Sequence, residues 1–248
     1  MKVETERNFQ LNKNAEERLK LEAAIRAFEL FKTAADSRTS TTEAIGALFA
    51  LAKLGQLDFA LQLLKQLWPQ GGIDSPGAVW VINKGLEADS KAIQEEAAEL
   101  LRANAERLPN EKGGHVWPYE PETWKPELSV SARISLLEAL LLCFLSRKIG
   151  YWDEHYLAGT VLPLSAVLET DDSPHVRCVA TLALQELLNM GVFQKGGLVT
   201  HGTGSVNVQA LREKVRKSRT GAGWETVPMQ QKLGQRLQEW VKDTTPEE

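Results

Sequence analysis

Apolar residues recur at helical spacing along most of this chain, and residues 157–188 show the pattern most clearly. In the first half of that stretch, apolar side chains repeat every three to four residues around Pro163, and an acidic turn follows at 169–172. A second apolar stripe begins behind Ser173-Pro174, residues that suit the cap and first turn of a helix. Neither helix can bury its stripe alone, so the pattern predicts a helix pair that packs against neighbours.

A similar stripe returns at a regular interval upstream. Three predicted helices, over 91–108, 129–145 and 174–188, each carry an alanine in the middle of their apolar stripe: Ala97, Ala139 and Ala180. Ala139 follows Ala97 by 42 residues and precedes Ala180 by 41. An interval of roughly 40 to 47 residues is typical of stacked helical hairpins. The spacing predicts that the three alanines occupy equivalent positions and face one shared interior.

Further helices are predicted towards the N-terminus. A helix pair over 43–68 turns at Gly55, and another helix begins at Ser75-Pro76. An amphipathic helix is expected over about 14–32, with an apolar stripe that should pack on a neighbour. That stripe consists of Leu21, Ile25, Phe28 and Phe31.

The segment 108–128 breaks the repeating pattern. Its four prolines exclude a regular helix, so the unit that ends in 129–145 lacks its first helix. The aromatic residues Trp117, Tyr119 and Trp124 then have two interpretations. Either they cover apolar surface left open by the missing helix, or the long loop that carries them binds a partner.

The C-terminal part follows a different pattern. Residues 191–208 predict a loop or a short β-hairpin, and 230–243 predict an amphipathic helix suited to cap the end of a helical array. The glycine-rich run at 200–205 lacks the spacing of a phosphate-binding loop. Between these segments, 211–219 predicts a basic helix with a single glutamate. Its cations are Arg212, Lys214, Arg216, Lys217 and Arg219.

Composition and charge narrow the function classes. The chain is 43% hydrophobic and 25% charged, as in an ordinary globular protein, with a formal net charge of −4 and an isoelectric point near 5.7. This balance gives no overall attraction to nucleic acid or to anionic membranes, and no apolar run reaches the roughly 20 residues of a membrane helix. The first ten residues lack the apolar core of a signal peptide. Cys143 and Cys178 lie on apolar helical faces, which favours a reduced compartment, the cytoplasm or the nucleus.

The sequence shows no motif that carries chemistry. No nucleophile and base pattern is visible, and the four histidines are far apart. The cysteines and histidines lack the paired spacing of a metal site. We therefore predict no catalytic, cofactor-binding or metal-binding residue. Glu99 and Arg102 are expected to form an i,i+3 pair on a solvated face.

Residues 157–188 resemble a HEAT repeat. The positions that carry the resemblance are Pro163, Asp172, Val176-Arg177, Ala180 and Leu184. It is weaker over 76–107 and 129–147, and the pair at 43–68 also resembles a tetratricopeptide or pentatricopeptide unit. The resemblance implies an all-α fold, a right-handed α-solenoid of irregular HEAT/armadillo-like hairpins, with Arg177 and Asp172 in a structural ladder. Together with the pattern of the flanking segments, this predicts three parts: an amphipathic helix and linker over 1–42, repeats over 43–190, and an irregular segment over 191–248.

By analogy with such folds, we expect a non-enzymatic scaffold or adaptor that binds a partner protein through its concave face and the 108–128 loop. The expected contact residues are Trp117, Tyr119, Trp124, Arg212, Lys214, Arg216, Lys217 and Arg219. The alternative is a nucleic-acid-associated protein, including a HEAT-like DNA glycosylase, because Tyr151-Trp152-Asp153 and Arg177 loosely resemble residues of that family. The acidic isoelectric point disfavours this alternative. No membrane partner is expected.

Overall fold

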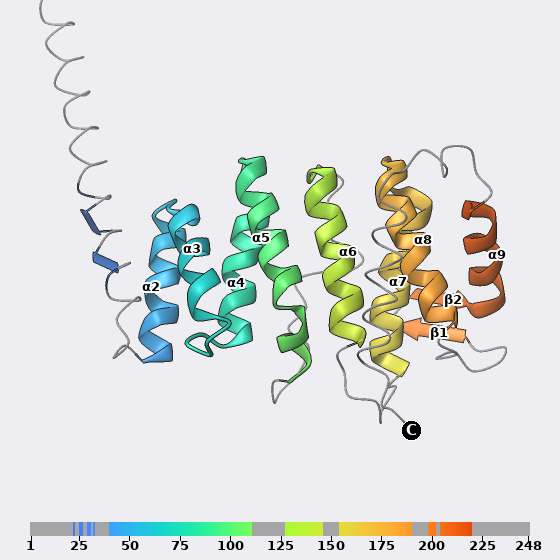
Figure 1. Ribbon diagram of the computed structural model, residues 1–248, viewed down its shortest axis with the longest axis horizontal. Helices are drawn as coiled ribbons and strands as arrows, with labels where there is room; N and C mark the ends of the chain where they lie inside the picture. The colour runs from blue at the N-terminus through green and yellow to red at the C-terminus, as the bar shows by residue number, and fades with distance from the viewer. Residues whose placement is uncertain are drawn as a thin grey trace, which may run out of the picture. The chain divides into compact units, whose positions relative to one another are not determined.

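The computed structural model describes most of the chain between residues 40 and 219 (Figure 1). The described ranges are 40–110, 127–145, 154–189, 198–201 and 204–219, together with Glu22, Ile25, Arg26, Glu29, Leu30 and Lys32. Within them lie eight α-helices, one 3-10 helix and a two-stranded hairpin, so the expected all-α class is confirmed. The chain divides into two compact units, Met1–Gly85 and Leu86–Glu248.

The first unit contains α2 (Thr41–Lys53), α3 (Leu57–Leu67) and most of α4 (Ser75–Leu86). Helix α2 begins with a capping box: the Glu43 N–H donates to Ser40 Oγ, and the Ser40 N–H donates to the Glu43 carboxylate, 2.9 Å away. The turn to α3 passes through Gly55, whose φ of 75° suits glycine. The predicted helix pair and its turn are therefore confirmed.

Helices α2 and α4 approach closely in this unit. The rings of Phe49 and Trp80 lie with their centroids 4.0 Å apart. Gly77 lies against Ile45, and its N–H donates to Asp74 Oδ1 over 2.8 Å at the start of α4. A side chain larger than hydrogen at Gly77 would collide with both neighbours, so glycine permits this packing.

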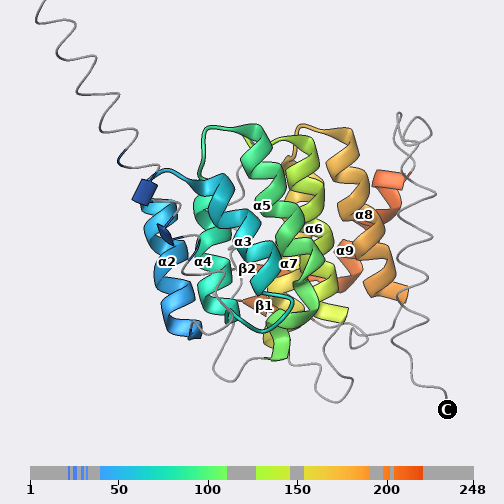
Figure 2. The ribbon, with the colours of Figure 1, turned by 60° about the vertical axis from the view of Figure 1, so that its left-hand side comes forward.

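The second unit begins with α5 (Lys91–Ala103), the 3-10 helix η1 (Ala105–Asn110), α6 (Val130–Leu145), α7 (Glu154–Thr170) and α8 (Pro174–Asn189). It continues with β1 (Leu198–His201), β2 (Gly204–Asn207) and α9 (Val208–Arg219). Helix α6 packs between α5 and α8, while α7 pairs with α8 and α9 packs on α8 (Figures 1 and 2). The antiparallel hairpin pairs Leu198 with Asn207 and packs on α7, which confirms the hairpin interpretation.

The three alanines at matching intervals are completely buried. Ala97 lies in α5, Ala139 in α6 and Ala180 in α8, each with 0% of its surface exposed. Because α5 packs on α6 and α6 packs on α8, each alanine lies in a helix next to the helix that carries the following one. Small side chains at such positions let helices approach closely.

Element ends differ from the predictions where local chemistry intervenes. Helix α5 ends at Ala103, not at 108, and the chain continues as a 3-10 turn. The Asn104 side chain donates to the Leu100 carbonyl oxygen over 3.0 Å, and Pro109 follows, so the α-helix stops here. Helix α9 begins at Val208, before the predicted 211, because Asn207 Oδ1 accepts from the N–H groups of Gln209 and Ala210.

One packing prediction is wrong where the structure tests it. Ile25 was expected on a buried stripe, yet 53% of its surface is exposed. The amphipathic pattern specifies a face but supplies no partner for it, and only tertiary packing decides whether that face is covered. Leu21, Phe28 and Phe31 lie outside the described residues, as do 111–126 and the predicted helix at 230–243.

No helix in the described ranges combines the length and apolarity needed to cross a bilayer.

Candidate partner-binding site

Helix α9 carries the predicted cations, and its apolar face packs against other helices of the second unit. Val208, Leu211 and Val215 are spaced three and four residues apart and are at most 4% exposed. They belong to one hydrophobic cluster with residues of α6, α7 and α8. Burial of this face holds the helix in place, so its opposite, polar face has a fixed position.

Two polar contacts add to this attachment. The Lys214 ammonium forms an ion pair with the Glu169 carboxylate at the end of α7. The hydroxyl oxygens of Ser218 and Thr181 lie 2.8 Å apart, between α9 and α8. Thr181 donates its single hydroxyl hydrogen to the Arg177 carbonyl oxygen over 2.7 Å. Ser218 is therefore the donor and Thr181 the acceptor of the bond between the helices.

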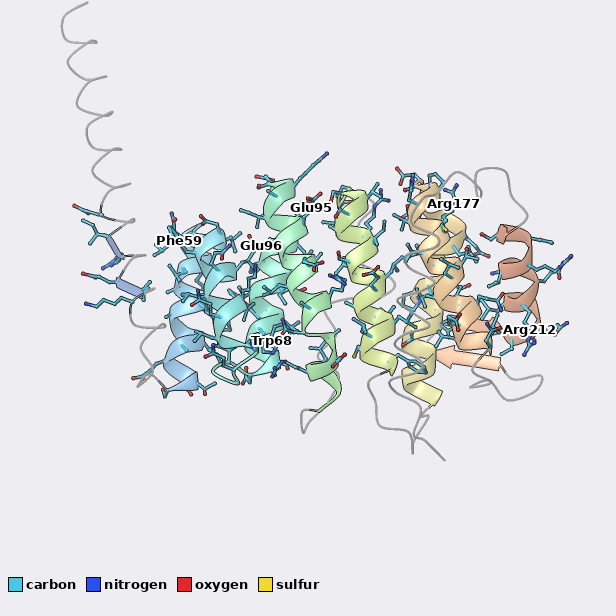
Figure 3. All side chains as sticks on the ribbon, viewed as in Figure 1. Phe59, Trp68, Glu95, Glu96, Arg177 and Arg212 are labelled. Atoms are coloured by element: carbon cyan, nitrogen blue, oxygen red, sulfur yellow. The ribbon has the colours of Figure 1, made fainter. Side chains whose placement is uncertain are left out.

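The outward face of α9 is basic. Arg212, Arg216 and Lys217 are all exposed (Arg212 is labelled in Figure 3). Arg216 donates to the Glu213 carboxylate over 2.6 and 3.1 Å, and this hydrogen bond and charge lower the pKa of Glu213 and raise that of Arg216. Ion pairs this exposed exchange readily with solvent and with other ions. We call Arg212, Arg216 and Lys217 the α9 basic face.

The structure thus divides the predicted contact residues. Arg212, Arg216 and Lys217 are exposed to solvent, whereas Lys214 is turned towards α7 and paired there. The side chain of Arg219 lies outside the described residues. So do Trp117, Tyr119 and Trp124, and the 108–128 loop that carries them keeps both of its interpretations.

A buried charge cluster lies at the turn between α7 and α8. Arg133 of α6 donates through Nη1 to both carboxylate oxygens of Asp171, at 2.8 and 2.9 Å, and to Asp172, at 2.7 Å. Asp171 also accepts from the Ser173 N–H over 2.9 Å. The hydrogen bond and positive charge of Arg133 lower the pKa of Asp172. This cluster fixes the turn against α6.

The role of Arg177 differs from the one its resemblance implies. Its Nη1 donates to the carbonyl oxygens of Asp171, at 2.5 Å, and Asp172, at 3.0 Å, so it binds the backbone of the turn. The Asp172 carboxylate is held by Arg133 instead. Sequence reasoning missed Arg133, although an arginine on the strongly apolar 129–145 pattern signals a buried charge that needs a partner.

A second polar strip joins α5 and α6. Arg102 donates to Glu99 over 2.7 Å, which confirms the predicted i,i+3 pair. The predicted solvated face is wrong for Arg102, because its side chain is 18% exposed and lies 3.3 Å from Glu138 of α6, whose side chain is 11% exposed. The Glu99 hydrogen bond, together with the charges of Glu99 and Glu138, raises the pKa of Arg102. Glu95 and Glu96 lie half-buried on the same helix (Figure 3).

In the part of the chain that the structure describes, no group of three or more His, Cys, Asp or Glu side chains is placed to hold a metal ion. Tyr151, Trp152 and Asp153, which prompted the glycosylase comparison, lie outside that part. Comparison of the chain with models of protein families, with curated proteins and with solved structures gives no match.

Proposed function

We propose that this chain is a non-enzymatic helical-repeat scaffold of the HEAT/armadillo-like α-solenoid type, and that it binds a partner protein. The observation that carries the proposal is the complete burial of Ala97, Ala139 and Ala180 in α5, α6 and α8. Their intervals of 42 and 41 residues fit stacked units of one kind. Stacked repeats present extended surfaces, and recognition is the activity that such surfaces support.

The α9 basic face is the docking surface that the described residues favour, and its partner is an acidic segment of another protein. Arg212 and Arg216 are four residues apart and so share a side of the helix, and the exposed Lys217 follows about 100° further round the helix. Buried residues hold this helix in place, so its cations are presented on a fixed surface. In a chain of net charge −4, such a local positive patch attracts acidic segments without attracting polyanions over the whole surface.

The 108–128 loop is the second part of the proposed interface, through Trp117, Tyr119 and Trp124. Aromatic residues on long loops are frequent anchors at protein interfaces.

Cytoplasmic or nuclear placement belongs to the proposal too. It rests on Cys178, which is buried, and Cys143, which is half-buried, since thiols packed on helical faces suit a reduced compartment.

The α9 basic face would also attract the phosphates of a nucleic acid, so it is compatible with the nucleic-acid alternative. The environment of Arg177 argues against the glycosylase form of this alternative. A glycosylase of this kind would need Arg177 on the surface that binds DNA. Its Nη1 already donates to two carbonyl oxygens of its own turn. This arrangement supports a structural role for Arg177.

A binding titration distinguishes the two functions. Fluorescein-labelled glutamate-rich peptide, random duplex DNA and random single-stranded DNA are each titrated with the protein at several salt concentrations, with anisotropy as the readout. The test variant is Arg212→Glu/Arg216→Glu/Lys217→Glu. The matched control, Lys53→Glu/Lys65→Glu/Lys91→Glu, makes the same charge change at exposed lysines of other helices.

We expect the acidic peptide to bind with micromolar affinity, the test variant to weaken it at least about tenfold, and the control to leave it nearly unchanged. Equal binding by the test variant and the control contradicts the assignment of α9. Tighter binding of DNA than of the peptide, with a steep loss of affinity at higher salt, favours the nucleic-acid alternative.

A further inference from the structure

The last turn of α9 contains a hydroxyl in an unusually basic stretch of sequence. Ser218 follows Lys214, Arg216 and Lys217 and precedes Arg219. Its hydroxyl donates to Thr181 of α8 over 2.8 Å, because Thr181 donates its own hydrogen to the Arg177 carbonyl oxygen. Thr181 is completely buried, whereas Ser218 is only half-buried. The Ser218 hydroxyl therefore lies at the edge of the packed region and contributes to attachment of the helix.

The apolar attachment of α9 ends before this turn. Val215 is the last of its three buried apolar residues, and Arg216 and Lys217, which follow, are exposed. Residues 216–219 can therefore unwind without exposing a residue of the hydrophobic cluster. Helix ends that lack buried apolar contacts open locally at small free-energy cost. Such opening presents Ser218 in an extended segment with cations on both sides.

From this combination we infer that Ser218 is a phosphorylation site for a protein kinase that selects basic sequences, and that its phosphorylation releases the last turn of α9 from α8. In the reaction, Ser218 Oγ attacks the γ-phosphorus of ATP. The bond from that phosphorus to the β-phosphate oxygen breaks and ADP leaves, while the hydroxyl proton passes to the kinase's base. An acidic kinase groove recognises the same cations that make the stretch basic.

Release of the last turn of α9 follows from the donors and acceptors that Ser218 and Thr181 have. A phosphoserine dianion has oxygen acceptors and no proton to donate, while Thr181 has already given its hydrogen to the Arg177 carbonyl. As long as Thr181 keeps its bond to the Arg177 carbonyl oxygen, two acceptors face each other at the former 2.8 Å contact. The new negative charge also lies at a helix C-terminus, where the helix dipole disfavours it. Lys214, four residues earlier, is drawn from Glu169 towards the phosphate, so both polar attachments of α9 are lost together.

The experiment uses the full chain, ATP and the catalytic domain of a serine/threonine kinase that selects basic residues before its target. Phosphopeptide mapping by mass spectrometry gives the site and stoichiometry, and amide hydrogen exchange gives the release. Ser218→Ala removes the acceptor hydroxyl, and Arg216→Ala/Lys217→Ala removes cations but keeps Ser218. Thr181→Val frees the Ser218 hydroxyl while approximately keeping the side-chain volume.

We expect near-stoichiometric phosphate on Ser218, none there in Ser218→Ala, and at least about tenfold slower transfer to Arg216→Ala/Lys217→Ala. Transfer to Thr181→Val should be several-fold faster. Phosphorylation should speed amide exchange in 216–219 about tenfold or more and leave α8 unchanged. Failure to modify Ser218 in the folded chain overturns the site, whether or not a peptide of residues 209–222 is modified. Stoichiometric phosphate with unchanged exchange in α9 overturns the release.

Discussion

Arg133 and Asp171, 38 residues apart in the sequence, form a buried two-oxygen contact at 2.8 and 2.9 Å. The Arg133 side chain is 5% exposed and that of Asp171 0%, so water solvates neither charge well. Protein groups take the place of water: Arg133 also donates to Asp172, and Asp171 also accepts from the Ser173 N–H. The contact joins α6 to the turn between α7 and α8 and so fixes α6 against that helix pair.

Removing one partner of this pair should cost far more stability than removing a nearby exposed charge. Arg133→Ala leaves the Asp171 carboxylate buried without its cation, and we expect a loss of about 3–5 kcal/mol in the free energy of unfolding. Urea denaturation followed by circular dichroism measures it. The control is Asp172→Asn at the neighbouring carboxylate, 77% exposed. Equal losses in the two variants would contradict the role of burial.

Stability should also fall in acid through Asp172. Arg133 lowers the pKa of this carboxyl in the folded chain relative to the unfolded one. A lowered pKa means that the unfolded chain takes up the proton first, so the contribution is complete above the ordinary Asp pKa, about 3.9. It declines as the pH falls from there through the folded pKa. Melting temperature against pH should fall less steeply in this range for Asp172→Asn, and identical slopes would refute the linkage.

Burial of the repeated alanines can be tested by replacing one of them with a charged residue. Ala180→Asp places a carboxylate among the buried apolar residues of α6, α7 and α8, and we expect a loss of several kcal/mol. Ala92→Asp is the control, because Ala92 is exposed in the first turn of α5, where a negative charge suits the helix dipole. Thermal unfolding compares the two. An unchanged melting temperature for Ala180→Asp would refute the assigned core face.

Two helical glycines in the first unit should respond in opposite directions to the same substitution. At Gly77, an added Cβ would lie 2.9 Å from Asp74 Oδ1 and 3.0 Å from Ile45 Cγ1, so Gly77→Ala should destabilise the chain by about 1–3 kcal/mol. At Gly46, inside α2, a Cβ meets nothing within 4 Å. Gly46→Ala should stabilise by about 0.5–1 kcal/mol. Chemical denaturation of both variants checks the sign of each change.

The two interpretations of the 108–128 loop give different results for Trp117→Ala/Trp124→Ala. If these rings cover apolar surface, the melting temperature should drop by several degrees, since each large aromatic loses its buried area. If they contact a partner, the melting temperature should hold while partner binding weakens. Thermal unfolding and anisotropy on the same samples separate these results. No change in either quantity would leave the loop without a role in the proposal.

Local chemistry in the sequence was enough to predict helices α2 to α9, apart from some of their ends, and the turn at Gly55, while it left 191–208 as a loop or a hairpin. Each depends on residues a few positions apart: a cap, a glycine with positive φ, or an apolar stripe with period 3.6. The basic helix was also visible, because five cations close together need no fold to be recognised. What these cations contact could not be read in this way.

Only the tertiary structure decided the partners. It paired Lys214 with Glu169 and joined Ser218 to Thr181, 37 residues away, while Arg212 and Arg216 stayed on the surface. It also assigned the Asp172 carboxylate to Arg133, whereas the local pattern offered Arg177. The physical reason is that side-chain partners depend on how helices pack and rotate against one another. That geometry results from the summed burial of many apolar residues, and no short stretch of sequence encodes it.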